Sequence, residues 1–181
     1  MMKNEMKLSM DAISENEALG RICIATFLTR LHPTLEELED VKTAVSEAIT
    51  NAIIHGVPAD GKVYITCRCE KDIFHVEIED HGVGIAAEEL DHVWDRYYKA
   101  SSNMVRATEG SGLGLSIVKE ILTLHKVNYG VESTLGSGTT FWFELNYVKT
   151  EKEKPAAPAL TDPASGSTDD DPKLKTKHYN Q

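Results

Sequence analysis

The stretch Val45-Ser46-Glu47-Ala48-Ile49-Thr50-Asn51-Ala52-Ile53-Ile54-His55-Gly56 decides the fold of this chain. Its composition predicts a helix that is apolar nearly all round, apart from Glu47, Asn51 and His55. Residues at i, i+4 and i+8 stack on one side of a helix, so these three side chains form a single polar stripe. An asparagine oxygen suits Mg²⁺, and a carboxylate one turn away can take a proton from a hydroxyl. The stripe therefore predicts half of a phosphoryl-transfer site.

Two glycine-rich segments further along the chain predict the other half. In Asp80-His81-Gly82-Val83-Gly84 an acid ends an alternating strand, and the two glycines let the backbone pass close to a flat ligand such as adenine. Gly110-Ser111-Gly112-Leu113-Gly114-Leu115 leads into an amphipathic helix, whose free amides and dipole favour polyphosphate. Each motif alone is a weak signal, whereas the three in this order within one domain are specific for a nucleotide.

The three motifs together resemble the ATP-binding fold of sensor histidine kinases, anti-sigma serine kinases, gyrase and the Hsp90 chaperones. The resemblance covers roughly residues 5 to 148. The first part is most similar to the sporulation anti-sigma-F factors, on residues 3–6, 14–17, 33–38 and 45–56. From Asp80 onward the chain is more similar to a sensor histidine kinase, on residues 93–100, 110–120, 129–133 and 138–141.

The resemblance implies a role for each residue of the stripe and for Asp80. Asn51 would bind Mg²⁺, and Glu47 would be the general base of the serine-kinase branch. Asp80 would recognise the exocyclic amine of adenine. His55 would either contact the phosphates or cap the end of its helix, where a cation interacts favourably with the dipole, and both roles stay open.

Four residues outside these motifs complete the expected site. By the resemblance, Thr139 makes a water-mediated contact near adenine. The polar segment 99–109 is the natural lid over a nucleotide, and within it Lys99 and Arg106 are either phosphate contacts or surface groups. Arg21 matches a position at which anti-sigma-F factors contact the sigma factor, and it is otherwise a surface helix residue.

Length and composition indicate one domain followed by a tail. The chain has 181 residues, 41% of them hydrophobic, which is enough for one domain with a core but not for two. We expect the ATP-binding domain over residues 1–148. Residues 149–181 carry almost no large apolar side chains, so we expect a disordered tail that is either a solvated extension or a partner-binding arm.

Charge and hydropathy exclude several partners. The formal net charge is -10 and no Lys/Arg-rich patch is interleaved with aromatic residues, which argues against nucleic acid. An acidic ATP-binding protein needs Mg²⁺ or local cations to offset phosphate repulsion. No apolar run approaches the roughly 18 residues of a membrane span, and the N-terminus lacks a signal-peptide pattern. We therefore expect a cytosolic protein without a membrane partner.

Hydrophobic periodicity predicts a two-layer α/β sandwich, with helices over one face of a mixed, mainly antiparallel sheet. Capping boxes at Ser14/Glu17 and Thr34/Glu37 would begin two helices, and a short helix is expected over residues 88–94. A later helix should run from Leu113 to about residue 125, before a final hairpin that turns at residues 136–138.

Three cysteines, Cys23, Cys67 and Cys69, give an odd count and no C-x₂-C pair. A zinc site with nearby histidines is conceivable. The sequence favours the alternative, in which they are free thiols that pack as small apolar groups.

The leading hypothesis is an anti-sigma factor that is also an ATP-dependent protein serine kinase, with a sigma factor and an anti-anti-sigma factor as partners. The seven histidines include no His-Glu-x-x-x-Pro motif, and we expect no two-helix dimerisation domain before Val45, which argues against a complete sensor kinase. One alternative is a histidine-kinase-like ATP-binding module whose phosphoacceptor lies on another protein, and the lid supports it. Another is a non-catalytic, ATP-gated binding protein, against which Glu47 argues. The oligomeric state stays open, a homodimer included.

Overall fold

The computed structural model describes residues 3–55, 60–70, 73–98 and 111–146. Its strands are β1 (Asn4–Asp11), β2 (Lys62–Glu70), β3 (Ile73–Asp80), β4 (Tyr129–Thr134) and β5 (Gly138–Asn146). They form one sheet in the order β1-β2-β3-β5-β4, and each neighbouring pair is antiparallel. The described sheet is thus antiparallel throughout rather than mixed. The chain leaves β1 at Asp11, passes through α1 and α2, and begins β2 at Lys62, which pairs with Asp11, so β2 runs opposite to β1.

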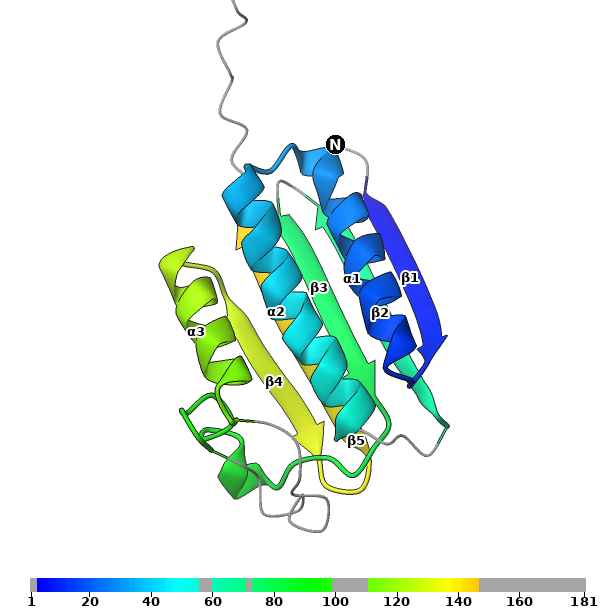
Figure 1. Cartoon of the computed structure of the whole chain (residues 1–181), viewed down its shortest axis with the longest axis vertical. Helices are drawn as coiled ribbons and strands as arrows, with labels where there is room; N and C mark the ends of the chain where they lie inside the picture. Colours follow the sequence, from blue (N-terminus) through cyan, green and yellow to red (C-terminus); the bar gives the residue numbers. More distant parts are fainter. Residues whose placement is uncertain (1–2, 56–59, 71–72, 99–110, 147–181) are drawn as a thin grey trace, which may run out of the picture. The chain divides into compact units, whose positions relative to one another are not determined.

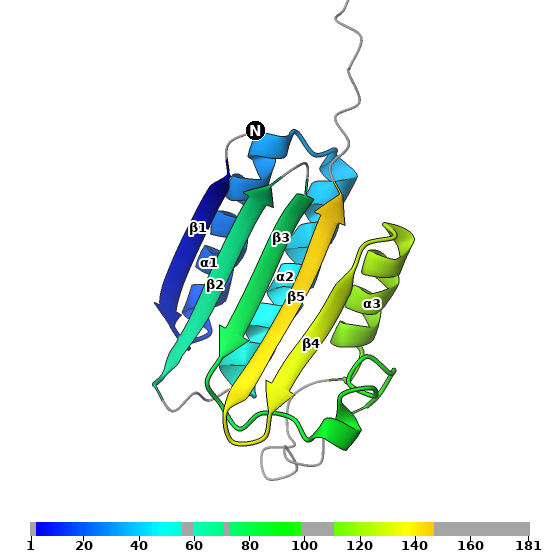
Figure 2. The same ribbon diagram turned by 180° about the vertical axis from the view of Figure 1, so that it is seen from behind.

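The helices form a single layer. They are α1 (Glu15–Leu28), α2 (Leu35–Ile54) and α3 (Gly114–Leu124), with short 3₁₀ turns η1 (Thr29–Leu31) and η2 (Ala87–Glu89). Figure 1 shows α2 between α1 and α3 over one face of the sheet, and Figure 2 shows the opposite face without a helix. This is the expected two-layer sandwich. None of the helices in the described ranges is long and apolar enough to cross a membrane.

The starts of the helices agree only in part with the sequence signals. Thr34 and Glu37 form the predicted capping box of α2, since each side chain bonds to the other's backbone N–H. The capping box predicted at Ser14 is wrong. Ser14 has helical backbone angles (φ -59°, ψ -30°) and its side chain makes no cap hydrogen bond, whereas an N-cap needs an extended backbone. The Glu17 carboxylate bonds to other side chains instead.

The short helix predicted over residues 88–94 is also wrong, because only the 3₁₀ turn η2 forms there. The chain then leaves helical geometry through Tyr97, whose φ is 66°. The N–H of Tyr97 donates to the carbonyl of Gly112 at 2.8 Å, so a contact with the glycine-rich segment replaces a helical hydrogen bond. The other boundaries agree closely with the prediction, with α3 ending at Leu124 and the last hairpin turning before Gly138.

The hydrophobic core lies between the helix layer and the sheet. Alternate residues of the central strands face the helices, and Ile65, Val76 and Ile78 are essentially inaccessible to solvent, as are Val45 and Ile49 of α2. α2 contacts α1, α3 and the sheet through its buried residues, which are Val41, Ala44, Val45, Ala48, Ile49, Ala52 and Ile53. The helix is amphipathic rather than apolar nearly all round, because Glu36, Glu39 and Thr43 are exposed.

The cysteines behave as free thiols in the described structure. Cys67 is fully buried in the core, and burial raises the pKa of its thiol to about 12. Within the described ranges, no group of three or more His, Cys, Asp or Glu side chains is placed to hold a metal ion.

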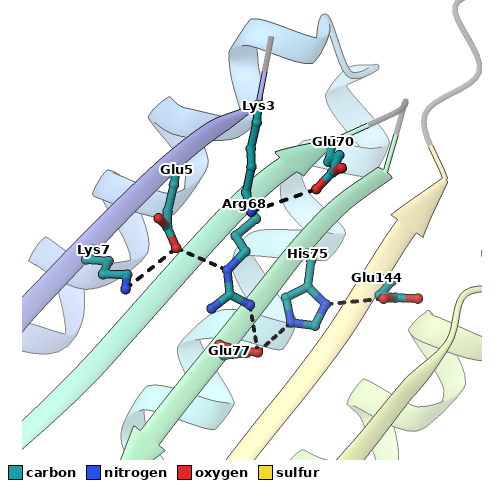
Figure 3. Close-up of polar contacts among 8 residues, drawn as sticks. All are labelled: Lys3, Glu5, Lys7, Arg68, Glu70, His75, Glu77 and Glu144. Carbon is teal, nitrogen blue, oxygen red and sulfur yellow. Dashed lines mark hydrogen bonds and ion pairs between the residues drawn. The ribbon is translucent and has the colours of Figure 1, made fainter. Parts of the chain in front are cut away.

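The face of the sheet that the helices leave open carries charged side chains that pair across the strands (Figure 3). Arg68 of β2 lies 3.1 Å from Glu5 of β1 and 3.1 Å from Glu77 of β3. His75 lies between Glu77 and Glu144 of β5, at 2.9 and 3.3 Å. Partly exposed pairs of this kind contribute little to stability. They show that the sheet has one apolar face and one polar face, so the site must be sought on the helix side or at the strand ends.

Candidate functional site

Glu47 and Asn51 project from the second half of α2, with Asn51 in its last turn and Ala48, Ile49 and Ala52 buried beside them. Burial raises the pKa of the Glu47 carboxyl, and the nearby Asn51 amide acts in the opposite direction. The Glu47 carboxylate and the Asn51 amide are close enough to interact, but they do not form a hydrogen bond with good geometry. Nδ2 of Asn51 is therefore buried without a hydrogen-bond partner in the described structure. Leaving a buried amide unpaired costs about 1 to 3 kcal/mol. A ligand with an oxygen acceptor at this point would remove that cost.

Gly114, the first residue of α3, lies directly against the Glu47 carboxylate. A Cβ atom added at Gly114 would overlap both carboxylate oxygens and the carboxyl carbon of Glu47. The last glycine of the Gly-x-Gly-x-Gly run is therefore needed because a side chain of α2 occupies the space beside it. The contact also places the Glu47 carboxylate at the N-terminus of a helix, where the dipole favours negative charge.

Asp80 ends β3 with only 4% of its surface exposed. Its Oδ1 accepts a hydrogen bond from the N–H of Gly82 at 2.8 Å, and the backbone N–H of Thr139 also bonds to the carboxyl group. Burial raises the pKa of Asp80, while these two amides pull it down. A carboxylate has about four acceptor positions, so capacity remains for a ligand donor such as an exocyclic amine.

The loop that follows Asp80 packs on the β4–β5 hairpin. Gly84 has a φ of 67°, and a Cβ atom there would overlap the carbonyl oxygen of Thr134. Glycine at this position thus permits a close approach of the loop to the hairpin. The result is that Asp80 and Thr139, from segments about sixty residues apart in sequence, are register partners on neighbouring strands.

A groove of about 280 Å³ runs along α2 and brings Arg21 of α1 together with Glu47. Nε of Arg21 donates to Oε1 of Glu17 at 3.0 Å, and the Ser46 hydroxyl donates to the same oxygen at 2.7 Å. Glu17 therefore links Arg21 to α2. Its contact on α2 is Ser46, the residue just before Glu47. The residues that line the groove are Arg21, Glu39, Lys42, Thr43, Ser46, Glu47, Gly114, Ile117 and Val118.

Sequence reasoning missed the roles of Glu17 and Ser46. The spacing of Glu17 and Arg21, four residues apart on a helix, was a usable signal for their ion pair. The bond from Ser46 to Glu17 spans 29 residues of sequence, and nothing local announces it.

Some of the remaining predicted site residues are described by the structure, and the others lie outside the described ranges. His55 occupies the C-cap of α2, the position at which helix capping was expected, and contact with phosphate stays a prediction. Leu115 packs against the hydrophobic core from the first turn of α3. Three predicted residues lie outside the described ranges, namely Lys99, Arg106 and Gly110.

Comparison with known proteins identifies the family of the chain. Residues 36–149 match the family described as histidine kinase-, DNA gyrase B-, and HSP90-like ATPase. An anti-sigma F factor of Oceanobacillus iheyensis is 42% identical over 123 residues, which are 67% of this chain and 80% of that protein. The chain belongs to the anti-sigma F factor family. Another member, from Geobacillus thermodenitrificans, is 38% identical over 83% of this chain and 97% of its own length. The member from Bacillus subtilis is 37% identical, over 77% and 90%.

Solved structures share the fold at lower identity. The mycobacterial sensor histidine kinase MprB superposes with a TM-score of 0.56 at 22% identity, covering 76% of this chain and 97% of that one. The catalytic domain of the histidine kinase ThkA gives a TM-score of 0.52 at 18% identity, covering 81% and 97%. The sequence relatives therefore confirm the predicted anti-sigma-F family. The similar solved structures confirm the predicted sandwich fold.

Proposed function

We propose that this chain is an ATP- and Mg²⁺-dependent protein serine kinase that also binds a sigma factor in the cytosol, with an anti-anti-sigma factor as its phosphoryl acceptor. The match to a family of ATPases supports ATP as a ligand, and the similarity to proteins named anti-sigma F factor supports a sigma factor as a partner. The observation that carries the kinase activity is the groove that holds Arg21 and Glu47 side by side.

The nucleotide would bind between the end of β3 and the start of α3. Asp80 would accept a hydrogen bond from the adenine amine, since its carboxylate keeps free acceptor positions beside the Gly82 and Thr139 amides. The phosphates would then lie toward the N-terminus of α3, whose amides and dipole favour anions.

Asn51 fits a role beside the phosphates, because its buried amide has an unpaired atom in the described structure. The side-chain oxygen would face Mg²⁺ and the side-chain nitrogen would donate to a phosphate oxygen. When bound, the metal ion would neutralise phosphate charge during transfer. The chain's own contribution is to hold the amide in the last turn of a helix that packs on the core.

Glu47 would act as the general base. Its carboxylate would accept the proton of a partner's serine hydroxyl as the oxygen attacks the terminal phosphorus of ATP, and the bond from that phosphorus to the bridging oxygen would break to release ADP. The pKa of Glu47 is raised by burial, which makes the carboxylate a stronger base. Gly114 holds the carboxylate from the other side.

The groove would receive the protein partner. Arg21 is about one-third exposed and is oriented by Glu17, so part of its guanidinium is free to bind an acidic side chain of the partner. Lys42, on the same groove, adds a second positive charge. A serine near an acidic residue of the partner would then reach Glu47 along the floor of the groove.

The test is to incubate the chain with γ-labelled ATP, a sigma factor and an anti-anti-sigma protein, and to compare it with Glu47→Gln. We expect acid-stable phosphoserine on the anti-anti-sigma protein and a rate lower by about 10² to 10⁴ in the variant, the usual contribution of a positioned base. Sigma binding should be the same in both. An acid-labile phosphoprotein formed at the wild-type rate by Glu47→Gln would instead identify a histidine-kinase-like module.

A further inference from the structure

Ser133 forms a row with the two residues expected to recognise adenine. Asp80 of β3 pairs with Thr139 of β5, and Thr139 pairs with Ser133 of β4. Directly opposite residues of antiparallel strands project to the same face, here the face that the helices cover. Asp80 and Thr139 are buried and Ser133 is half-buried.

The Ser133 hydroxyl oxygen has three close polar neighbours. The N–H of Ile85 donates to it at 2.8 Å. It lies 2.7 Å from the carbonyl oxygen of Gly138 and 3.0 Å from the hydroxyl oxygen of Thr139. It therefore joins the loop after Asp80 to both strands of the hairpin.

Counting hydrogens fixes the direction of each bond. A serine hydroxyl has one proton and two lone pairs. A carbonyl oxygen can only accept, so the proton of Ser133 goes to Gly138, the nearer of the two oxygens. The bond between the hydroxyls must then run from Thr139 to Ser133, which satisfies all three positions on the Ser133 oxygen.

The consequence concerns Thr139. The only hydroxyl proton of Thr139 is directed at Ser133. The lone pairs of the Thr139 oxygen remain, and they can only accept hydrogen bonds. The carboxylate of Asp80 is likewise an acceptor. Both Asp80 and Thr139 therefore present acceptors. In a direct contact with the base, in place of the water-mediated contact that the resemblance implies for Thr139, they match the amine at position 6 of adenine and repel the carbonyl oxygen at that position in guanine or hypoxanthine.

We propose that Ser133 is a specificity-determining residue, which holds the Thr139 hydroxyl as an acceptor and so makes the base site selective for a 6-amino purine over a 6-oxo purine. The inference rests on the proposed ATP-binding function. Ser133 acts through Thr139 and is a positioning residue, so its effect should be on the choice of base and not on phosphoryl transfer.

The experiment measures the dissociation constants of ATP and inosine triphosphate, which carries a carbonyl oxygen in place of the 6-amine, by calorimetric titration. In Ser133→Ala, the Thr139 hydroxyl is free to rotate and donate. We expect the ratio of the inosine triphosphate constant to the ATP constant to fall by about tenfold, the worth of one hydrogen bond. Ser133→Thr, which keeps a hydroxyl, should keep the wild-type ratio. Ser137→Ala, an exposed serine of the same hairpin, is the matched control and should also keep it.

Each outcome decides the question. If Ser133 only supports the structure, both constants rise together in Ser133→Ala, and the unchanged ratio overturns the inference while ATP binding by the wild type leaves the proposed function intact. A wild type that binds neither nucleotide overturns both. Should Ser133→Ala fail to fold, Thr139→Val removes the acceptor itself. We expect the same loss of preference there, and an unchanged ratio in that variant would also overturn the inference.

Discussion

Replacing Gly114 by alanine should separate catalysis from folding. Gly114 is not in the left-handed region, so alanine can adopt its backbone, and alanine is the better helix former by up to about 1 kcal/mol. The added methyl group would overlap the Glu47 carboxylate, the mobile end of a half-buried side chain. The carboxylate must therefore retreat by about 1 Å or more, and a misplacement of that size can lower a rate by about 10²-fold.

We expect Gly114→Ala to keep the wild-type melting temperature and to transfer phosphate to the anti-anti-sigma protein about 10²-fold more slowly. The assay is single-turnover transfer from labelled ATP, with ATP affinity measured separately by titration. Gly61→Ala is the matched control. Nothing lies within 4 Å of its new methyl group, but its φ is 67°, so it should lower stability and leave the rate unchanged.

A double variant tests whether the loss passes through Glu47. On a Glu47→Gln background the base is already absent, so Gly114→Ala should lower the rate little further, and the two effects should be far from additive. A wild-type rate in the single variant would refute the reasoning. So would a loss found wholly in ATP affinity, because Gly114 would then serve the phosphates and not the base.

Four further outcomes follow from the site and the sequence. Asp80→Asn should weaken ATP binding by about 2 to 4 kcal/mol, because an amide donor would face the adenine amine, and calorimetry that finds unchanged affinity would remove Asp80 from the base site. Asn51→Ala should abolish the gain in ATP affinity that Mg²⁺ gives, whereas equal losses with and without the ion would contradict a metal role. The pKa of Glu47 is raised on folding, so its contribution to stability is full below its unfolded value of 4.5 and is lost as the pH rises through the folded value. Glu47→Gln should therefore be more stable than the wild type toward urea at pH 7, with a gain that vanishes near pH 4. Removing the residues after Thr150 should leave the melting temperature and ATP affinity unchanged, since that segment has too little apolar surface to offset its ordering entropy, and a clear drop would show that it docks.

The parts of the site that the sequence predicted are those in which a local rule is broken. Glu47 and Asn51 stand among the small and apolar residues of the second half of α2, and such exceptions tend to mark functional positions. Asp80 was recognisable because glycines follow an acid at the end of an alternating strand. The local pattern was sufficient in both cases to single out the residue, since its signal lies within a few neighbours along the chain, and the role of each residue stays a prediction.

The parts that the sequence did not predict depend on contacts between distant segments. The predicted cap at Ser14 failed because Glu17 is drawn to Ser46, which lies on another helix. The predicted helix over residues 88–94 is replaced by turns in which His92 and Asp95 bond to the carbonyls three residues earlier, and the chain then turns toward Gly112 through Tyr97. Hydrogen-bond direction at Ser133 is set by Ile85 and Gly138 together, and neither neighbour is visible from the sequence around Ser133.

The position of α2 links these observations. As the central helix it contacts both α1 and α3, so its polar stripe can meet Arg21 on one side and Gly114 on the other. The same central position desolvates Glu47 and leaves the Asn51 amide unpaired, which lowers the stability of the empty domain. Any ligand that pairs with Asn51 recovers part of that stability, so nucleotide binding and rigidity of the partner groove should rise together. A kinase that also holds a sigma factor would gain from this arrangement, because the nucleotide would then strengthen the surface on which either protein docks.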